Sequence, residues 1–179
     1  MKSFLELASA RQSDRAYEPG RVIGREVLER ILEAGRLAPS ACNGQPWHFT
    51  VVTDPALLVE VGKATSSLGM NRFVKDASAL VLITLEPTNI TSRIGCGIKE
   101  KDFPMMDLGI ASAYITLAAE DEGVGSCILG WFDEKRVKEL VGIPQKKRLM
   151  LIISLGYNAK PKRKKIRKEF DKVVSFEKY

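Results

Sequence analysis

The chain has few of the side chains that most often carry out chemistry in proteins. Its 179 residues include one histidine, His48, and three cysteines, Cys42, Cys96 and Cys127. Cysteines so widely spaced, odd in number and without a Cys-x-x-Cys pair predict neither a disulfide framework nor a zinc site. A catalytic Ser-His-Asp or Cys-His set would have to use His48. His48 begins an apolar strand, where we expect a structural role; contact with substrate is the alternative.

Short motifs of the common hydrolase and nucleotide-binding folds are also missing. No Gly-x-Ser-x-Gly and no Gly-x-x-x-x-Gly-Lys-Ser/Thr occurs, and the glycines at 95–97 and 123–125 do not complete Gly-x-Gly-x-x-Gly. If the protein is an enzyme, its chemistry is therefore expected to belong to a cofactor. The longest apolar run, near 77–85, is far shorter than the roughly 20 residues of a membrane helix. Glu6 interrupts what would be a signal-peptide core, so we expect a cytoplasmic protein.

Charge is distributed unevenly along the chain. Residues 1–157 carry 19 basic and 19 acidic side chains, whereas residues 158–179 carry nine basic and three acidic ones, which accounts for the whole net charge of +6. A nucleic-acid-binding protein usually spreads its basic surface more widely. With 45% hydrophobic and 28% charged residues, the composition predicts a single globular domain over 1–179 with a basic tail at 158–179.

Hydrophobic periodicity predicts alternating helices and strands. We expect helices at 4–11, 25–37, 55–65, 107–122 and 134–141, strands at 47–53, 79–85, 124–131 and 149–157, and a long loop at 86–104. The strand at 79–85 is apolar on both faces and is therefore expected to be central. The alternation is typical of an α/β or an α+β layered domain.

The helix at 107–122 has apolar side chains almost all round it. Such a helix needs cover on every side, and a domain of this size rarely provides it alone. A partner subunit would supply the missing cover, and the small residues along the helix would allow it to approach closely. A simple core helix explains the pattern equally well.

Three segments have compositions that suit ligand binding. Arg11, Ser13 and Arg15 would lie on one side of an extended segment and could bind a phosphate monoester. Residues 38–47 read Ala-Pro-Ser-Ala-Cys-Asn-Gly-Gln-Pro-Trp, a loop rich in amides and hydroxyls that could hydrogen-bond a planar heterocycle. Residues 126–133 place Gly130 where backbone N–H groups could approach a ligand. Taken singly, these segments are also explained by an exposed helix end and by turns that satisfy their own backbone.

In this order, the segments resemble the nitroreductase family of flavin enzymes, and the match extends over nearly the whole chain. The stretch Ala-Pro-Ser-Ala-x-Asn-x-Gln-Pro-Trp-His-Phe at 38–49 is the most specific part. The resemblance implies an α+β fold with a central, mainly antiparallel sheet, and an intertwined homodimer with FMN at the interface. It also implies NADH or NADPH as electron donor and a small-molecule acceptor such as a nitroaromatic or a quinone, reduced by a ping-pong hydride relay through flavin N5. No nucleic-acid partner, membrane partner or metal is implied.

Site residues follow from the same resemblance, position by position. No side chain is implied as catalytic, because N5 carries the hydride and the backbone near Gly130 faces it. The implied cofactor contacts are Arg11, Gln12, Ser13 and Arg15 in the N-terminal segment; Pro39, Ser40, Ala41, Asn43 and Gln45 in the loop, with Pro39–Ala41 serving the partner's site; Leu129 and Gly130 after the strand; and Lys165 and Arg167 in the tail. The chain departs from the family pattern at Gln12, where Arg or His is common, and at Glu169, where Pro is common.

Two further expectations concern the three cysteines and the alternative functions of the protein. Cys42 and Cys127 are expected to be small buried residues, and Cys96 lies in the long loop that is expected to form part of the acceptor pocket. Specialised chemistry on the same fold, such as dehalogenation, flavin fragmentation or heterocycle oxidation, is the alternative function. A non-catalytic flavin- or nucleic-acid-binding protein is a further alternative, but it leaves the loop at 38–49 unexplained.

Overall fold

A four-stranded antiparallel sheet forms the centre of the protein in a computed structural model that describes residues 3–66, 69–87 and 101–179. The strands are β1 (Trp47–Val52), β2 (Ala79–Leu85), β3 (Gly125–Leu129) and β4 (Arg148–Gly156), and they lie in the order β1-β2-β4-β3. All three pairings are antiparallel, with a register shift between Ile83 and Thr84 where β2 meets β4. The sheet thus confirms the α+β alternative and the central position of β2.

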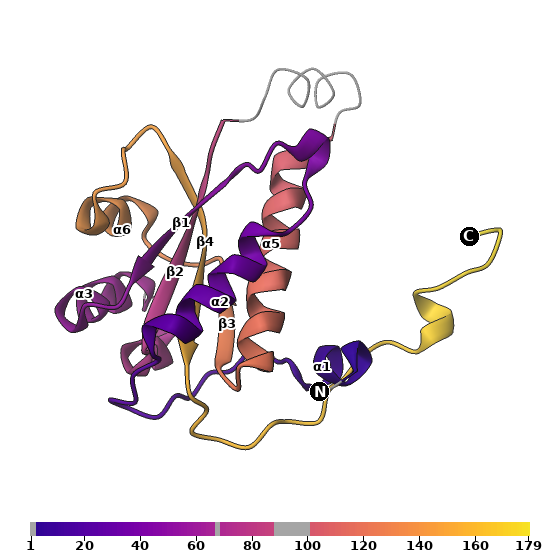
Figure 1. Ribbon diagram of the computed structural model, residues 1–179, viewed down its shortest axis with the longest axis horizontal. Helices are drawn as coiled ribbons and strands as arrows, with labels where there is room; N and C mark the ends of the chain where they lie inside the picture. The colour runs from indigo at the N-terminus through magenta and orange to yellow at the C-terminus, as the bar shows by residue number, and fades with distance from the viewer. Residues whose placement is uncertain (1–2, 67–68, 88–100) are drawn as a thin grey trace.

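Helices cover both faces of this sheet (Figure 1). On one face lie α3 (Pro55–Thr65) and α6 (Glu134–Val141), and on the other lie α2 (Arg25–Arg36) and α5 (Phe103–Asp121). Each face has its own cluster of buried apolar side chains, because successive strand residues point to opposite sides. Leu80 and Leu82 belong to the α3/α6 cluster, and Val81 and Ile83 belong to the α2/α5 cluster.

Local capping fixes the ends of the helices that the sequence predicts most accurately. Asp54 accepts a hydrogen bond from the backbone N–H of Leu57, and Asp133 accepts one from that of Arg136, at the starts of α3 and α6. Gly142 follows α6 with a φ of 73°, the left-handed conformation that glycine adopts without strain. The predicted ranges 55–65 and 134–141 are therefore confirmed.

The sequence-based boundaries are wrong in several other places. Phe103 and Pro104 belong to the first turn of α5 and not to the loop, because Asp102 caps this helix by accepting from the backbone N–H of Met105. The strand predicted at 124–131 covers only 125–129, and the strands predicted at 47–53 and 149–157 are each shifted or shortened by about one residue. Residues 88–100, which include Cys96, lie outside the described residues.

The start of the chain and the returning segment at 162–165 lie side by side near the C-terminal end of α5. The short helix α1 (Phe4–Ala10) packs near this end, and an extended arm at 11–17 leads from it along the sheet (Figure 1). After β4 the chain returns past α1 and then runs away from the body, with one 3-10 turn at η4 (Phe170–Lys172). None of the helices in the described ranges combines the length and the apolar character needed to cross a bilayer.

Candidate functional site

The arm at 11–17 is held against the edge strand β3. Ser13 forms a parallel bridge with Ser126, and the N–H of Asp14 donates to the Ser126 carbonyl at 2.8 Å. The Asp14 carboxylate accepts from the Ser126 N–H at 3.3 Å and from the Gln12 amide at 2.7 Å, so its charge is satisfied although its side chain is buried. This pairing keeps the arm extended, as the alternation of Arg11, Ser13 and Arg15 requires.

A basic hollow of about 480 Å³ lies between this arm and the returning C-terminal segment. Its lining brings together Arg11, Gln12, Ser13 and Arg15 from the arm with Arg163, Lys164, Lys165 and Arg167 from the tail. Every arm and tail residue for which the sequence predicts a phosphate or ribityl contact therefore lines one hollow. Among the described residues, no acidic side chain contributes to its lining, so the hollow suits an anion with several oxygens.

The tail is fixed to the arm by hydrogen bonds from its basic residues. The Nζ of Lys165 donates to the carbonyls of Ala8 at 2.7 Å and Arg11 at 2.6 Å. Arg163 donates its Nη2 to the Ser13 carbonyl at 3.0 Å and its backbone N–H to the Gln12 side chain at 3.1 Å. Burial, together with the nearby Arg11 and Arg167, lowers the pKa of the Lys165 ammonium.

Lys162 anchors the same segment to α5. Its Nζ pairs with the Glu120 carboxylate and also donates to the Ala10 carbonyl at 3.1 Å. Glu120 is only 6% exposed, so the paired ammonium offsets the cost of burying its charge. Nothing in the sequence distinguishes Lys162 or Arg163 from the other tail bases, because their partners are a carboxylate and carbonyls that are distant in sequence.

Residues 38–46 form a second group at the other end of α5. Asp107, near the start of this helix, accepts from the Ala41 N–H at 3.1 Å and so holds the turn η1 (Ala41–Asn43). The Gln45 N–H donates to Ser40 Oγ at 2.9 Å, and the Gln45 amide donates to the Asn43 side chain at 3.2 Å. The predicted amide-rich loop is thus an ordered structure with its polar groups at the surface.

Three non-glycine residues of this loop have left-handed backbone conformations. Cys42, Asn43 and Gln45 have φ values of 50°, 51° and 46°. Such conformations are uncommon for cysteine and glutamine and often occur where a loop is shaped for binding. The prediction that Cys42 is buried is wrong, because this turn directs it to the surface.

The strand end at 128–131 forms a third group. Gly130 is exposed, and apart from its chain neighbours no atom of the described residues lies within 4 Å of a Cβ placed there, so a ligand could approach the backbone directly. Trp131 is 54% exposed, and its carbonyl accepts from the Asn71 amide at 3.0 Å, which fixes the turn. Leu129 is buried, so only its backbone is available to a ligand.

Cys127 and His48 are the remaining candidates from the sequence, and both lie on edge strands of the sheet. Cys127 is buried, as predicted, and burial raises the pKa of its thiol against the opposing effects of Arg15 and Ser13. His48 lies on the exposed side of the edge strand β1. Within the described ranges, no three histidine, cysteine, aspartate or glutamate side chains are grouped so that they could hold a metal ion.

Comparison with known proteins identifies the family of the chain. The model of the nitroreductase family matches residues 8–72 and 65–157. A protein of Archaeoglobus fulgidus, whose name NADH dehydrogenase/NAD(P)H nitroreductase is itself provisional, is 34% identical over 165 residues, which cover 88% of this chain and 86% of that protein. The chain belongs to the nitroreductase family. It is, by this membership, a nitroreductase-type oxidoreductase.

Two further comparisons agree with this family membership. The solved structure of an FMN-dependent nitroreductase from Clostridium difficile has a TM-score of 0.80 and 26% identity, and the match covers 98% of this chain and 100% of that one. An iodotyrosine deiodinase of Thermotoga neapolitana is 27% identical over 191 residues, which cover 94% of this chain and 96% of that protein. The resemblance seen in the sequence is thus confirmed, together with the α+β nitroreductase-like fold.

Proposed function

We propose that this nitroreductase-family chain binds FMN and uses NADH or NADPH to reduce a small electrophilic acceptor, such as a nitroaromatic or a quinone. The observation that carries the proposal is the basic hollow between the arm and the tail. It combines guanidinium and ammonium groups with a serine hydroxyl, and these groups match the oxygen acceptors of a phosphate monoester.

The residues present fit FMN at both ends of the molecule. Arg11, Arg15 and Arg167 would hold the phosphate, and Ser13 would contact the ribityl chain. The open backbone at Gly130 would give a planar ring access, because among the described residues only its chain neighbours come within 4 Å of where its side chain would be. A resident dinucleotide is not required, which agrees with the missing Gly-x-Gly-x-x-Gly motif.

The chemistry that bound FMN supplies is hydride transfer through N5, from NADH or NADPH to the acceptor. The protein's contribution is to position and to stabilise charge. The Gly130 N–H would donate a hydrogen bond to the ring. A cation or amide donors beside the ring's pyrimidine side would offset negative charge there. No side chain of the described site is required to move a proton.

The proposal includes a homodimer, because the two halves of the predicted site are far apart within one chain. The loop at 39–45 is hydrogen-bonded to Asp107. The C-terminal segment that lines the basic hollow is instead held by the ion pair between Lys162 and Glu120. Asp107 and Glu120 are 13 positions apart on α5, which corresponds to about 20 Å along a helix. A second copy that packs against α5 in the opposite direction would bring its own loop toward the first copy's basic hollow.

A direct test is to purify the protein and measure bound FMN and NAD(P)H oxidation with a panel of acceptors. A yellow protein that oxidises NADH or NADPH and passes electrons to nitroaromatics or quinones is expected. A colourless protein that neither takes up added FMN nor oxidises either nucleotide would contradict the proposal. Anaerobic stopped-flow reduction with each nucleotide, followed by reoxidation, would identify the donor.

The phosphate assignment has its own test. Replacing both Arg11 and Arg167 by alanine removes one guanidinium from the arm and one from the tail of the hollow. Each charged hydrogen bond contributes about 1.5–3 kcal/mol, so FMN affinity should fall about 100-fold or more. Fluorescence titration of the apoprotein measures this loss, and an unchanged affinity would refute the assignment.

A second candidate function is specialised flavin chemistry, of which dehalogenation is favoured by the similarity to the Thermotoga neapolitana iodotyrosine deiodinase. It predicts FMN binding with poor turnover of nitroaromatics and quinones. Halide release from halogenated phenols, measured with reduced enzyme, would separate the two. A non-catalytic nucleic-acid-binding role would instead appear as salt-dependent DNA or RNA affinity that persists when FMN is saturating.

A further inference from the structure

The basic residues of the tail make two different kinds of contact at the basic hollow. Lys165 is half-buried and directs its ammonium to the carbonyls of Ala8 and Arg11. The Ala8 carbonyl belongs to the last turn of α1, and Arg11 is the residue that ends this helix. Carbonyls at a helix C-terminus have no partner within the helix and carry its partial negative charge. Lys165 therefore caps α1.

Arg163 and Arg167 use only part of their hydrogen-bonding capacity in contacts with the described residues. The Arg163 guanidinium donates one bond, to the Ser13 carbonyl. The Arg167 guanidinium donates one bond, to the carbonyl of its own neighbour Ile166. A guanidinium has five N–H donors, and both side chains line the hollow. Both thus keep donors for an anion, in the planar geometry that suits two phosphate oxygens.

Arg163 is also placed between two hollows. Besides the basic hollow, it lines an adjoining one of about 390 Å³ that is bordered by Asp14, Asn158 and Lys160. Its bond to the Ser13 carbonyl keeps the guanidinium at the wall that the two hollows share. An anion in the basic hollow would accordingly meet Arg163 on one side and Arg11 and Arg15 of the arm on another.

We propose that Lys165 is a positioning residue that builds the hollow by capping α1, and that Arg163 and Arg167 are the tail's ligands for the anion. The inference rests on the proposed function in taking the phosphate of FMN as that anion. It assigns Arg163 a role that the family pattern did not suggest, and it moves Lys165 from direct contact to support of the arm. Because the arm also carries Ser13 and Arg15, loss of Lys165 should disturb the whole ligand site and not the phosphate alone.

The test compares Lys165→Met, Arg163→Met and Arg167→Met in the full-length chain, with Lys172→Met, an exposed tail position, as control. Lys165→Met should lower the Tm of the apoprotein by about 4 °C and speed hydrogen exchange in residues 4–13. Arg167→Met should change neither. Lys165→Arg, which can also donate to two carbonyls, should restore most of the lost Tm.

Binding of FMN and of riboflavin, which lacks the phosphate, separates the two roles. Arg163→Met and Arg167→Met should each weaken FMN binding about tenfold and leave riboflavin binding unchanged. Lys165→Met should weaken both to a similar degree. Loss of FMN binding alone in Lys165→Met, with an unchanged apoprotein Tm, would overturn the proposal, as would unchanged FMN affinity in Arg163→Met.

Inorganic phosphate keeps the test independent of the flavin. It should raise the Tm of the wild-type apoprotein and of Lys165→Met, but should raise it less in the two arginine variants. If the wild type binds neither FMN nor riboflavin, the proposed function fails, while the phosphate and Tm measurements still decide the roles of Lys165, Arg163 and Arg167.

Discussion

Tyr17 shows how burial changes the chemistry of a single residue. It is 2% exposed, and its hydroxyl lies 3.1 Å from the Ser154 carbonyl and 2.9 Å from Ser154 Oγ. Burial raises the pKa of Tyr17 far above its usual range, although the hydrogen bond to Ser154 acts in the opposite direction. An unfolded tyrosine ionises near pH 10, whereas the folded one stays protonated there. The free energy of unfolding should therefore fall as the pH rises above about 10.

Tyr17→Phe tests this linkage. At pH 7 the variant should be less stable by about 1 kcal/mol, because it loses the hydroxyl's hydrogen bonds. Above pH 10 the difference should shrink, because only the wild type loses stability through this group. Urea unfolding at pH 7, 9 and 10.5 measures both effects, with Tyr179→Phe at an exposed position as control. A difference that stays constant over this range would contradict the linkage.

Individual site residues were predictable from sequence to different degrees. The alternation of Arg11, Ser13 and Arg15 needs only an extended arm, and the pairing with Ser126 provides it. The tail residues were harder, because a run of similar bases has no internal feature that distinguishes a cap for α1 from an anion ligand. Only the folded chain shows that Lys165 reaches the Arg11 carbonyl, 154 residues away in sequence.

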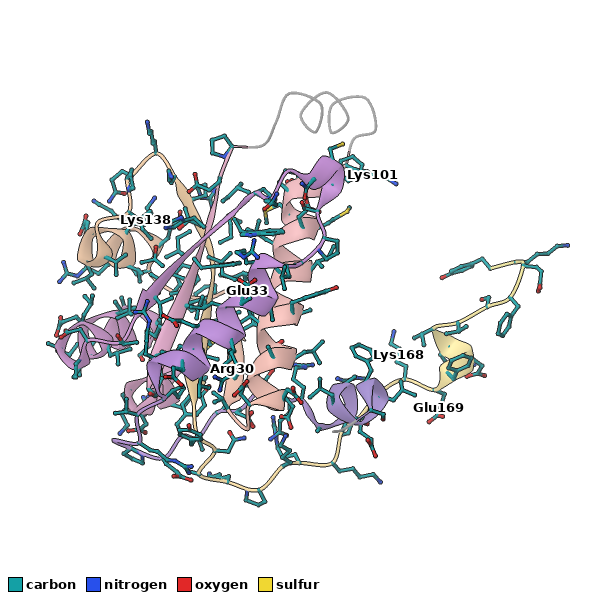
Figure 2. All side chains as sticks on the ribbon, in the orientation of Figure 1. Arg30, Glu33, Lys101, Lys138, Lys168 and Glu169 are labelled. Atoms are coloured by element: carbon teal, nitrogen blue, oxygen red, sulfur yellow. The ribbon has the colours of Figure 1, made fainter. Side chains whose placement is uncertain are left out.

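At the scale of whole elements, Lys138 links α6 to the loop that precedes β4. The residue is 6% exposed, and its ammonium donates to the carbonyls of Gln145 at 3.0 Å and Lys147 at 2.9 Å. Glu134, one turn earlier, lies 3.4 Å away and accepts from the Leu149 N–H. The ammonium thus provides hydrogen-bond donors for two carbonyls of the loop 142–147, which connects α6 to β4 (Figure 2).

Lys138→Met should lower the free energy of unfolding by about 2–4 kcal/mol, because two carbonyls and a partly buried carboxylate lose their donor. Lys135→Met, on the exposed face of the same helix, removes the same charge and should change stability by less than about 0.5 kcal/mol. Chemical denaturation of both variants measures the contrast. Equal effects would show that net charge, and not the loop contacts, is responsible.

Close packing between α2 and α5 depends on Gly35. A Cβ there would lie 2.5 Å from Cγ1 of Ile115 and 2.8 Å from its Cδ1. Gly35→Ala should therefore destabilise the protein by about 1–3 kcal/mol, although alanine favours a helix by about 1 kcal/mol over glycine. Adding Ile115→Ala should relieve the overlap, so the double variant should be more stable than the sum of the single effects predicts. Strict additivity in thermal unfolding would contradict this packing.

The elements were predicted best where their ends are fixed locally. Pro55 and Gly142 mark boundaries within one turn of the helices that they limit, and the ranges of α3 and α6 follow. The start of α5 was missed because its cap, Asp102, comes directly after a long polar stretch that resembles loop up to Pro104. The order of the strands cannot be predicted from any single segment of the sequence, because it depends on which apolar faces pack together in the folded chain.

At the scale of the whole molecule, two apolar surfaces are left exposed by the part of the chain that the structure describes. Met105, Met106, Ile110 and Tyr114 follow one face of α5 at helical spacing, and each is 37% to 53% exposed. The tail beyond Arg167 carries a second set, Phe170, Val173, Phe176 and Tyr179, which are 62% exposed or more. Lys168 and Glu169 lie where this segment leaves the body (Figure 2). A second copy of the chain would cover both surfaces at once. The basic charge of the tail does not indicate that its apolar side chains could serve in such an interface.

Removing residues 168–179 tests this arrangement and leaves every residue of the basic hollow in place. Burial of a large apolar side chain stabilises an assembly by about 1.5–3 kcal/mol, so loss of the four in the tail should dissociate a dimer that depends on them. The full-length chain should be dimeric by light scattering, and its Tm should rise with protein concentration. The truncated chain should be monomeric, with a Tm independent of concentration. Phe170→Ala combined with Phe176→Ala should have the same effect without shortening the chain. A monomeric full-length protein, or a truncated protein that dimerises equally well, would show that the tail does not join two copies.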